Sequence, residues 1–210
     1  MAVALLAVLA APCEAQAFAG RGYVFLLLFR RGHGLSTEQG PFVGDLLERQ
    51  LGDSGEDARN RLQIRLLETD HLDDARAGLA FLRALDQVDP ERVAAIGHSF
   101  GGSLTLLVAE PDSSLRAAVD FAGAAESWRR SPHRRARLLA AVGRSVVPTF
   151  FIQAANDYSV APARALAAEM TRLGKAHRLK IYPPFGRTPA EVTPSSTGLR
   201  RPGRRTCSRF

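Results

Sequence analysis

VAAIGHSFGGSLTLLVAE, residues Val93 to Glu110, is the most informative segment of the chain. An apolar run with β-branched residues enters Gly-His-Ser-Phe-Gly at residues 97–101, and a helix-forming run leaves it. A serine at a tight strand-to-helix turn needs small neighbours two residues to either side, because the backbone is strained and the helix passes close to the strand. The segment therefore predicts a nucleophile elbow with Ser99 as the attacking group.

The rest of the chain has the architecture that such an elbow requires. Short β-rich runs alternate with longer helical stretches, which is typical of a parallel sheet covered by helices on both faces. The predicted fold class is therefore α/β. Strands are expected at Tyr23–Phe29, Arg92–Gly97, Ala117–Phe121, Val147–Ile152 and Arg178–Tyr182, and helices at Asp70–Val88, Gly102–Ala109, Arg134–Val142 and Ala161–Leu173.

A charged segment, Phe42–Leu67, separates the first of these strands from its helix. Its composition predicts helix, interrupted near Gly52, Asp53 and Gly55, and we expect it to cap the site.

Two further site residues follow from the position of the elbow. The backbone N–H of Phe100 lies at a helix N-terminus, where it can stabilise the negative charge that develops in an oxyanion hole. Asp157 follows a predicted strand directly, and the carboxyl end of a strand is where a triad acid belongs. Its order after Ser99 fits the order Ser, Asp, His. The alternative is that Asp157 only caps the helix that begins near Ala161.

Several segments together resemble one family, the dienelactone hydrolases. They are RGYVFLLLFRRGHGLS (Arg21 to Ser36), TDHLDDARAGLAFL (Thr69 to Leu82), GHSFGG (Gly97 to Gly102), IQAANDYSVAP (Ile152 to Pro162) and KIYPPFGRTP (Lys180 to Pro189).

The resemblance covers Cys13 to Glu191 and implies an α/β-hydrolase fold, a small-molecule ester, lactone or other acyl substrate, and no cofactor or metal. Dienelactone hydrolases proper carry cysteine where Ser99 stands, so a serine esterase or acyl-peptidase relative is the nearer likeness. By the same resemblance, residues 1–187 form a hydrolase domain that lacks the first strands and the last helix of the fold. No His-Gly pair for the second half of the oxyanion hole precedes Tyr23.

The catalytic histidine is missing from its expected place. The resemblance puts it in a Gly-His pair shortly after the last strand, yet no histidine follows Ile181. His33 lies in a loop at the correct sheet edge, but such loops are usually structural in this fold. The chain as written is therefore expected to be impaired as an enzyme. The alternative is a non-catalytic scaffold that binds a ligand or a partner.

Length and composition limit the other possibilities. With 210 residues, 46% of them hydrophobic, the chain suits one domain with a core. Cys13 and Cys207 lie near opposite ends without metal-ligand spacing, which argues against a disulfide framework or a zinc site. The apolar stretch from Ala2 to Ala11 is interpreted as a buried strand or helix rather than a signal peptide, because no basic residue precedes it and it is too short to span a membrane. A cytoplasmic location without a membrane partner is expected, with secretion as the alternative.

The net charge of +7 comes largely from the end of the chain, where five arginines follow Arg187 against Glu191 alone. A second basic cluster comprises Arg129, Arg130, Arg134, Arg135 and Arg137. A solvated helix face is the favoured interpretation of this cluster and an anion site the alternative. Interleaved aromatic residues are missing, so no nucleic-acid partner is expected.

Residues 188–210 are rich in Pro, Ser, Thr, Gly and Arg, a composition that predicts a disordered basic tail. The family likeness stops abruptly after Glu191, which suggests that a GC-rich gene is being translated out of frame from that point.

Overall fold

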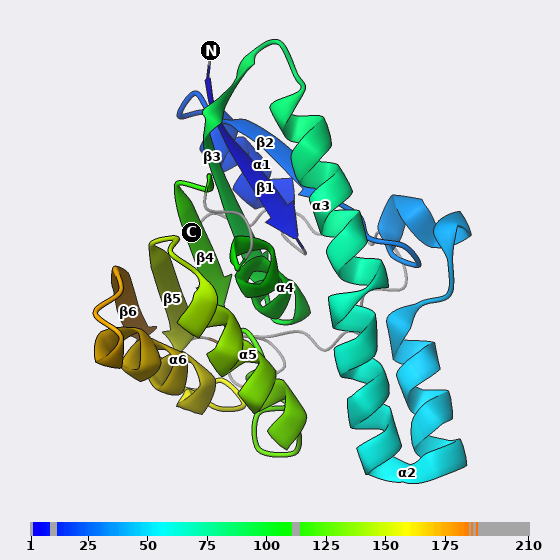
Figure 1. Ribbon diagram of the computed structural model, residues 1–210. Coiled ribbons are helices and arrows are strands. Elements are labelled where there is room, and N and C mark those ends of the chain that lie inside the picture. Colours follow the sequence, from blue (N-terminus) through cyan, green and yellow to red (C-terminus); the bar gives the residue numbers. More distant parts are fainter. Residues whose placement is uncertain (1, 9–11, 111–113, 185, 187, 189–210) are drawn as a thin grey trace.

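A six-stranded parallel sheet forms the centre of the protein (Figure 1). The computed structural model describes residues 2–8, 12–110, 114–184, 186 and 188. The strand order is β2-β1-β3-β4-β5-β6, and all neighbours run parallel. The strands are β1 (Ala2–Val8), β2 (Val24–Leu28), β3 (Val88–His98), β4 (Ala117–Phe121), β5 (Thr149–Ala154) and β6 (His177–Tyr182). The α/β class and the five strands expected from the sequence are confirmed.

The sequence alone did not decide whether the apolar segment near the N-terminus forms a strand or a helix, and in the structure it forms β1. It lies between β2 and β3 and pairs with both, and Ala4, Leu6 and Ala7 have no exposed surface. A strand covered on both faces carries a continuous apolar run rather than an alternating one, so periodicity alone cannot distinguish it from a buried helix.

Helices cover both faces of the sheet because the crossovers run in two directions. The unit β1-α1-β2 steps one way across the sheet, whereas β2-α3-β3 steps the other way, so right-handed connections place α1 and α3 on opposite faces. The helices are α1 (Pro12–Ala19), α2 (Val43–Glu68), α3 (Asp70–Arg83), α4 (Phe100–Ala109), α5 (Pro132–Arg144) and α6 (Ala161–Arg172), with a short 3-10 helix at Gly34–Gln39.

Two predicted boundaries near residue 88 were wrong. α3 ends at Arg83 rather than at Val88, and β3 begins at Val88 rather than at Arg92. The cause is long-range pairing, because Ala2 of β1 pairs with Val88 and extends the sheet beyond the apolar run.

α2 is the predicted helical insertion, and it folds back on itself at Gly55. This residue has φ +80° and ψ −178° inside the helix, a conformation that favours glycine. Figure 1 shows the result as two arms joined by a turn, with the second arm beside the first and leading directly into α3. Among the described residues no helix has both the length and the apolar character needed to cross a membrane.

α4 is buried along its whole length, from Phe100 to Ala109. A helix that is apolar on all sides belongs inside a protein, and α4 packs against β3, β4, α3 and α5. The N-terminus of α4 is therefore held firmly where β3 ends.

Candidate active site

Ser99 occupies the strained turn that the sequence predicts between β3 and α4. Its backbone has φ 55° and ψ −111°, in the region that residues with a side chain rarely adopt. The Ser99 N–H donates a hydrogen bond to the Phe121 carbonyl at 2.8 Å, which ties the turn to β4. A Cβ atom on Gly97 would lie 2.1 Å from the Gly101 carbonyl oxygen, so a larger residue cannot fit there without movement.

The position of this turn in the sheet suits a binding site. β1 and β3 are neighbours whose outgoing connections lead to opposite faces, and such a switch point opens a crevice at the carboxyl ends of the strands. Val8 pairs with Gly97, so the end of β1 lies beside the elbow. The loop after β1, residues 9–11, is where the second oxyanion donor is expected, and it lies outside the described residues.

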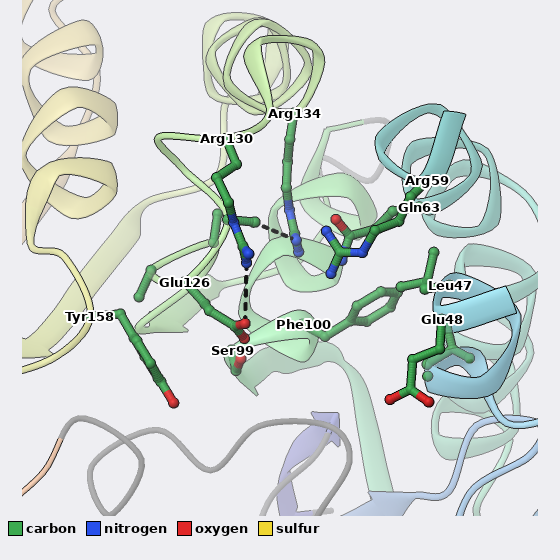
Figure 2. Close-up of a pocket in the computed structure, with 15 residues that line it drawn as sticks. Leu47, Glu48, Arg59, Gln63, Ser99, Phe100, Glu126, Arg130, Arg134 and Tyr158 are labelled. Atoms are coloured by element: carbon green, nitrogen blue, oxygen red, sulfur yellow. Dashed lines mark hydrogen bonds and ion pairs between the residues drawn. The ribbon is translucent and has the colours of Figure 1, made fainter. Parts of the chain in front are cut away.

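A cavity of about 400 Å³ opens at Ser99. Its wall comes from both arms of α2, the β4–α5 connection and the turn after β5 (Figure 2). The insertion contributes to the wall of the cavity, since Leu47, Glu48, Arg59 and Gln63 of α2 line it. No pattern within α2 marked these four residues as site residues, because their role depends on what the hairpin packs against.

Phe100, the first residue of α4, lies next to Ser99 in the cavity wall. The N–H groups of the first helical turn have no partner within the helix, so the Phe100 N–H is suited to donate a hydrogen bond to an anionic oxygen. Its ring is fixed from several sides: the Arg30 guanidinium lies 4.4 Å above the ring centroid, Arg134 lies at 5.7 Å, and His71 meets the ring edge-on at 5.2 Å.

Asp157 lies in the turn after β5 and is 8% exposed. One carboxylate oxygen accepts a hydrogen bond from the Tyr158 N–H at 2.7 Å, and the other accepts one from the Gln153 amide at 3.2 Å. Tyr158 lines the Ser99 cavity, so this turn reaches the site. The alternative role as a helix cap does not hold, because α6 begins after Val160 and has no side-chain cap.

None of the five histidines is among the residues that line the cavity. His33 is buried, with Nδ1 2.9 Å from the Arg31 carbonyl oxygen and Nε2 3.2 Å from the Arg30 guanidinium. Burial and the charge of Arg30 lower the pKa of His33 to about 4. Both ring nitrogens are engaged, which agrees with the structural role expected for this loop.

The other histidines lie elsewhere. His71 is buried in α3, where burial first and the charge of Arg30 second lower its pKa to about 3. His133 is an exposed residue near the start of α5, 3.7 Å from Asp57. His177 opens β6, at the amino end of that strand, and His98 ends β3 immediately before Ser99.

The basic cluster is not one solvated helix face. Arg129 and Arg130 are exposed, and Arg137 pairs with Glu68 and Glu110. Arg134, in contrast, is only 3% exposed and lines the Ser99 cavity. The favoured interpretation was therefore wrong for Arg134, because α5 presents this side chain inward to Ser103 and Ser127.

Comparison with known proteins agrees with this geometry. The model of the dienelactone hydrolase family matches residues 16–188. The quorum-quenching protein AidA of Acinetobacter baumannii (strain MDR-ZJ06) is 39% identical over 71 residues, which make up 34% of this chain and 22% of AidA.

Solved structures share the fold at low identity. The uncomplexed acylaminoacyl peptidase of Pyrococcus horikoshii superposes with a TM-score of 0.65 at 19% identity, over 95% of this chain and 35% of the peptidase. Esterase 2 of Thermogutta terrifontis, phosphorylated by paraoxon, gives a TM-score of 0.59 at 18% identity, over 87% of this chain and 71% of the esterase. The chain thus spans about a fifth of AidA and about a third of the peptidase.

Proposed function

Because the chain belongs to the dienelactone hydrolase family, we propose that it is by descent a serine hydrolase of ester, lactone or other acyl bonds in small molecules. The observation that carries this proposal is the conformation of Ser99. The residue is held at φ 55° between a buried strand and a buried helix, and it lines a cavity of about 400 Å³. Such strain is retained where a side chain must be presented to a substrate.

In this proposal the Ser99 Oγ attacks the carbonyl carbon of the substrate. The carbonyl oxygen becomes an oxyanion, which the Phe100 N–H stabilises by a hydrogen bond. The alcohol or amine of the substrate leaves, and water then hydrolyses the acyl-serine. Both steps need a base that takes a proton from the attacking oxygen and returns it to the leaving group. Asp157 is the carboxylate that would orient this base.

The base is the missing part, since no histidine lines the cavity. Members of a triad act as a unit, and removing the base costs on the order of a millionfold in rate. We therefore propose that the chain as written turns over esters very slowly. The same observation favours a second candidate function, a non-catalytic hydrolase scaffold that uses the cavity only to bind a ligand or a partner.

A fluorophosphonate probe and a 4-nitrophenyl ester together test the proposal. The probe should label the chain slowly at Ser99 and leave Ser99→Ala unlabelled. Ser54→Ala, a change of an exposed serine in α2, is the matched control and should be labelled like the unaltered chain.

Three results would change the proposal. Ester turnover far above buffer that depends on Ser99 would contradict the proposed loss of the base. If His33→Ala also removed that turnover, His33 would be the base. A folded chain that the probe never labels would favour the scaffold.

A further inference from the structure

Arg30 is a buried cation next to the wall of the Ser99 cavity. It follows β2 by two residues and is 1% exposed, and it is not among the residues that line the cavity. In the described part of the chain no carboxylate oxygen lies within 4.0 Å of its guanidinium, whereas its neighbour Arg31 pairs with Asp74 at 2.7 Å. A buried charge without an ion-pair partner is costly, so the groups around Arg30 must compensate it in another way.

Two neutral side chains contact the Arg30 guanidinium. Its Nη2 donates a hydrogen bond to Nε2 of His33 at 3.2 Å, and its central carbon lies 4.4 Å from the centroid of the Phe100 ring. Its Nε and Nη1 are buried and have no hydrogen-bond partner among the described residues. A cation over the face of an aromatic ring is attracted to it, and most strongly where water is excluded. The Phe100 ring therefore supplies part of the compensation that a carboxylate would otherwise provide.

Arg30 stays charged at neutral pH despite its burial. Burial lowers the pKa of Arg30 to about 9, against the opposing effect of the Asp74 charge. The contact with Phe100 is therefore one between a full positive charge and a ring face. Such a contact restrains the ring, because any movement of the ring exposes the buried charge to a poorer environment.

The position of the Phe100 ring bears on the direction of the Phe100 N–H. The peptide group between Ser99 and Phe100 is planar, so its orientation depends on ψ of Ser99 and φ of Phe100. Ser99 is held at φ 55° and ψ −111°, and the ring is contacted by Arg30 on its face and edge-on by His71 at 5.2 Å. Figure 2 shows the ring pointing away from the Ser99 turn, toward Leu47. A ring held in this way restrains the peptide group and its N–H.

We propose that Arg30 is a positioning residue: it holds the Phe100 ring, and through the ring it holds the Phe100 N–H in the direction that an oxyanion hole at Ser99 requires. This inference rests on the proposed function, because the N–H has a catalytic role only if Ser99 attacks an acyl carbon. Arg30 does not line the cavity, so it acts only through Phe100. Arg31 differs from it, since its ion pair with Asp74 joins the loop after β2 to α3.

The kinetics of fluorophosphonate labelling test this role, because attack of Ser99 on the probe also places negative charge on an oxygen beside the Phe100 N–H. Arg30→Met removes the charge and keeps an unbranched side chain. It should lower the maximal labelling rate roughly ten- to a hundredfold and leave the half-saturating probe concentration unchanged. Complete loss of an oxyanion donor costs on the order of a hundred- to a thousandfold, so a displaced donor should cost less. Arg30→Lys, which keeps a cation for the ring, should recover most of the rate.

Arg31→Met is the matched control, because it removes the neighbouring arginine and its ion pair with Asp74. It should lower the melting temperature and leave the maximal labelling rate unchanged at temperatures where the protein is folded. Phe100→Leu keeps the N–H and removes the ring, so it should also slow labelling, and it tests the same contact if Arg30→Met does not fold. Equal slowing in Arg30→Met and Arg31→Met, or labelling of Phe100→Leu at the unaltered rate, would overturn the positioning role.

An NMR spectrum of protein with nitrogen-15-labelled phenylalanine separates this inference from the proposed function. The Phe100 amide peak, identified by its absence from Phe100→Leu, should move in Arg30→Met and stay in place in Arg31→Met. If it stays in place in Arg30→Met, or if that variant is labelled at the unaltered rate, the positioning role is overturned and the hydrolase proposal stands. A peak that moves as expected in a folded chain that the probe never labels would overturn the hydrolase proposal and retain the positioning role.

Discussion

Gly97→Ala perturbs the closest backbone approach in the turn before Ser99. The added Cβ would lie 2.1 Å from the carbonyl oxygen and 2.3 Å from the carbonyl carbon of Gly101, and 2.6 Å from the Thr105 hydroxyl. The hydroxyl can rotate, but the Gly101 atoms belong to the backbone of α4. Because α4 is buried along its whole length, it cannot move away without disturbing the core.

The size of the effect follows from this geometry. Inserting a methyl group into a well-packed region costs typically 1–3 kcal/mol, and a contact with backbone belongs at the upper end, about 3 kcal/mol. For a chain of this size roughly 2–4 °C is lost per kcal/mol, so the melting temperature should fall by about 6–12 °C. Any helix shift also moves the Phe100 N–H, so fluorophosphonate labelling of Ser99 should slow as well.

Urea denaturation and thermal melting measure the effect, with Gly52→Ala as the matched control. Gly52 is an exposed residue inside α2, and a Cβ there would meet no atom within 4 Å. Alanine at this position should raise the free energy of unfolding by about 0.5–1 kcal/mol, because glycine weakens a helix interior. A Gly97→Ala protein as stable as the unaltered chain would refute the argument that close packing at the elbow requires glycine.

Three further outcomes are expected. Burial raises the pKa of Asp120 from 3.8 to about 7, against the opposing effects of the Gly123 N–H and the charge of Arg134. The folded state therefore binds a proton more tightly than the unfolded chain, so this carboxyl costs stability as pH rises from about 4 to 7, by on the order of 4 kcal/mol. In urea denaturation, the free energy of unfolding of Asp120→Asn should rise relative to that of the unaltered chain over that pH range. Parallel pH profiles of the two proteins would contradict this prediction. Leu107 in α4 is 1% exposed, and Leu107→Ala should lower the free energy of unfolding by about 2–5 kcal/mol in the same assay. A loss below about 1 kcal/mol would mean that the core around residue 107 collapses into the space left by the leucine side chain. Inserting one nucleotide ahead of the codon for Val192 should encode a Gly-His pair and raise Ser99-dependent hydrolysis of a 4-nitrophenyl ester by several orders of magnitude. Gene sequence that cannot encode histidine in the shifted frame would end that idea.

The elbow and its sheet could be predicted because their signals are local. The glycines two residues to either side of Ser99 indicate that the strand and the helix pack closely at the turn. The apolar runs at β2, β4 and β5 indicate that each of these strands is buried. Periodicity could not do the same for Ala2–Val8, because a strand covered on both faces has the same apolar run as a buried helix. The pairing of β1 with β3 settled that assignment.

The sequence alone also shows that no histidine follows β6. What the coordinates added is that both ring nitrogens of His33 are already engaged, by Arg30 and by the Arg31 carbonyl. A loop sequence lists the groups that can form hydrogen bonds but does not say which of them meet.

The amino-acid sequence by itself determined the α/β class, the strained serine turn and the carboxylate after β5, because each depends on residues within a few positions of one another. Only the tertiary structure decided that Arg134 faces inward and that Arg59 lines the same cavity beside Ser99. These two residues are far apart in the chain, and nothing in the local pattern of α2 or α5 indicates that both line one cavity. The shared cavity arises because α2 folds back at Gly55 and packs against α5, and such packing depends on the whole core rather than on any one segment.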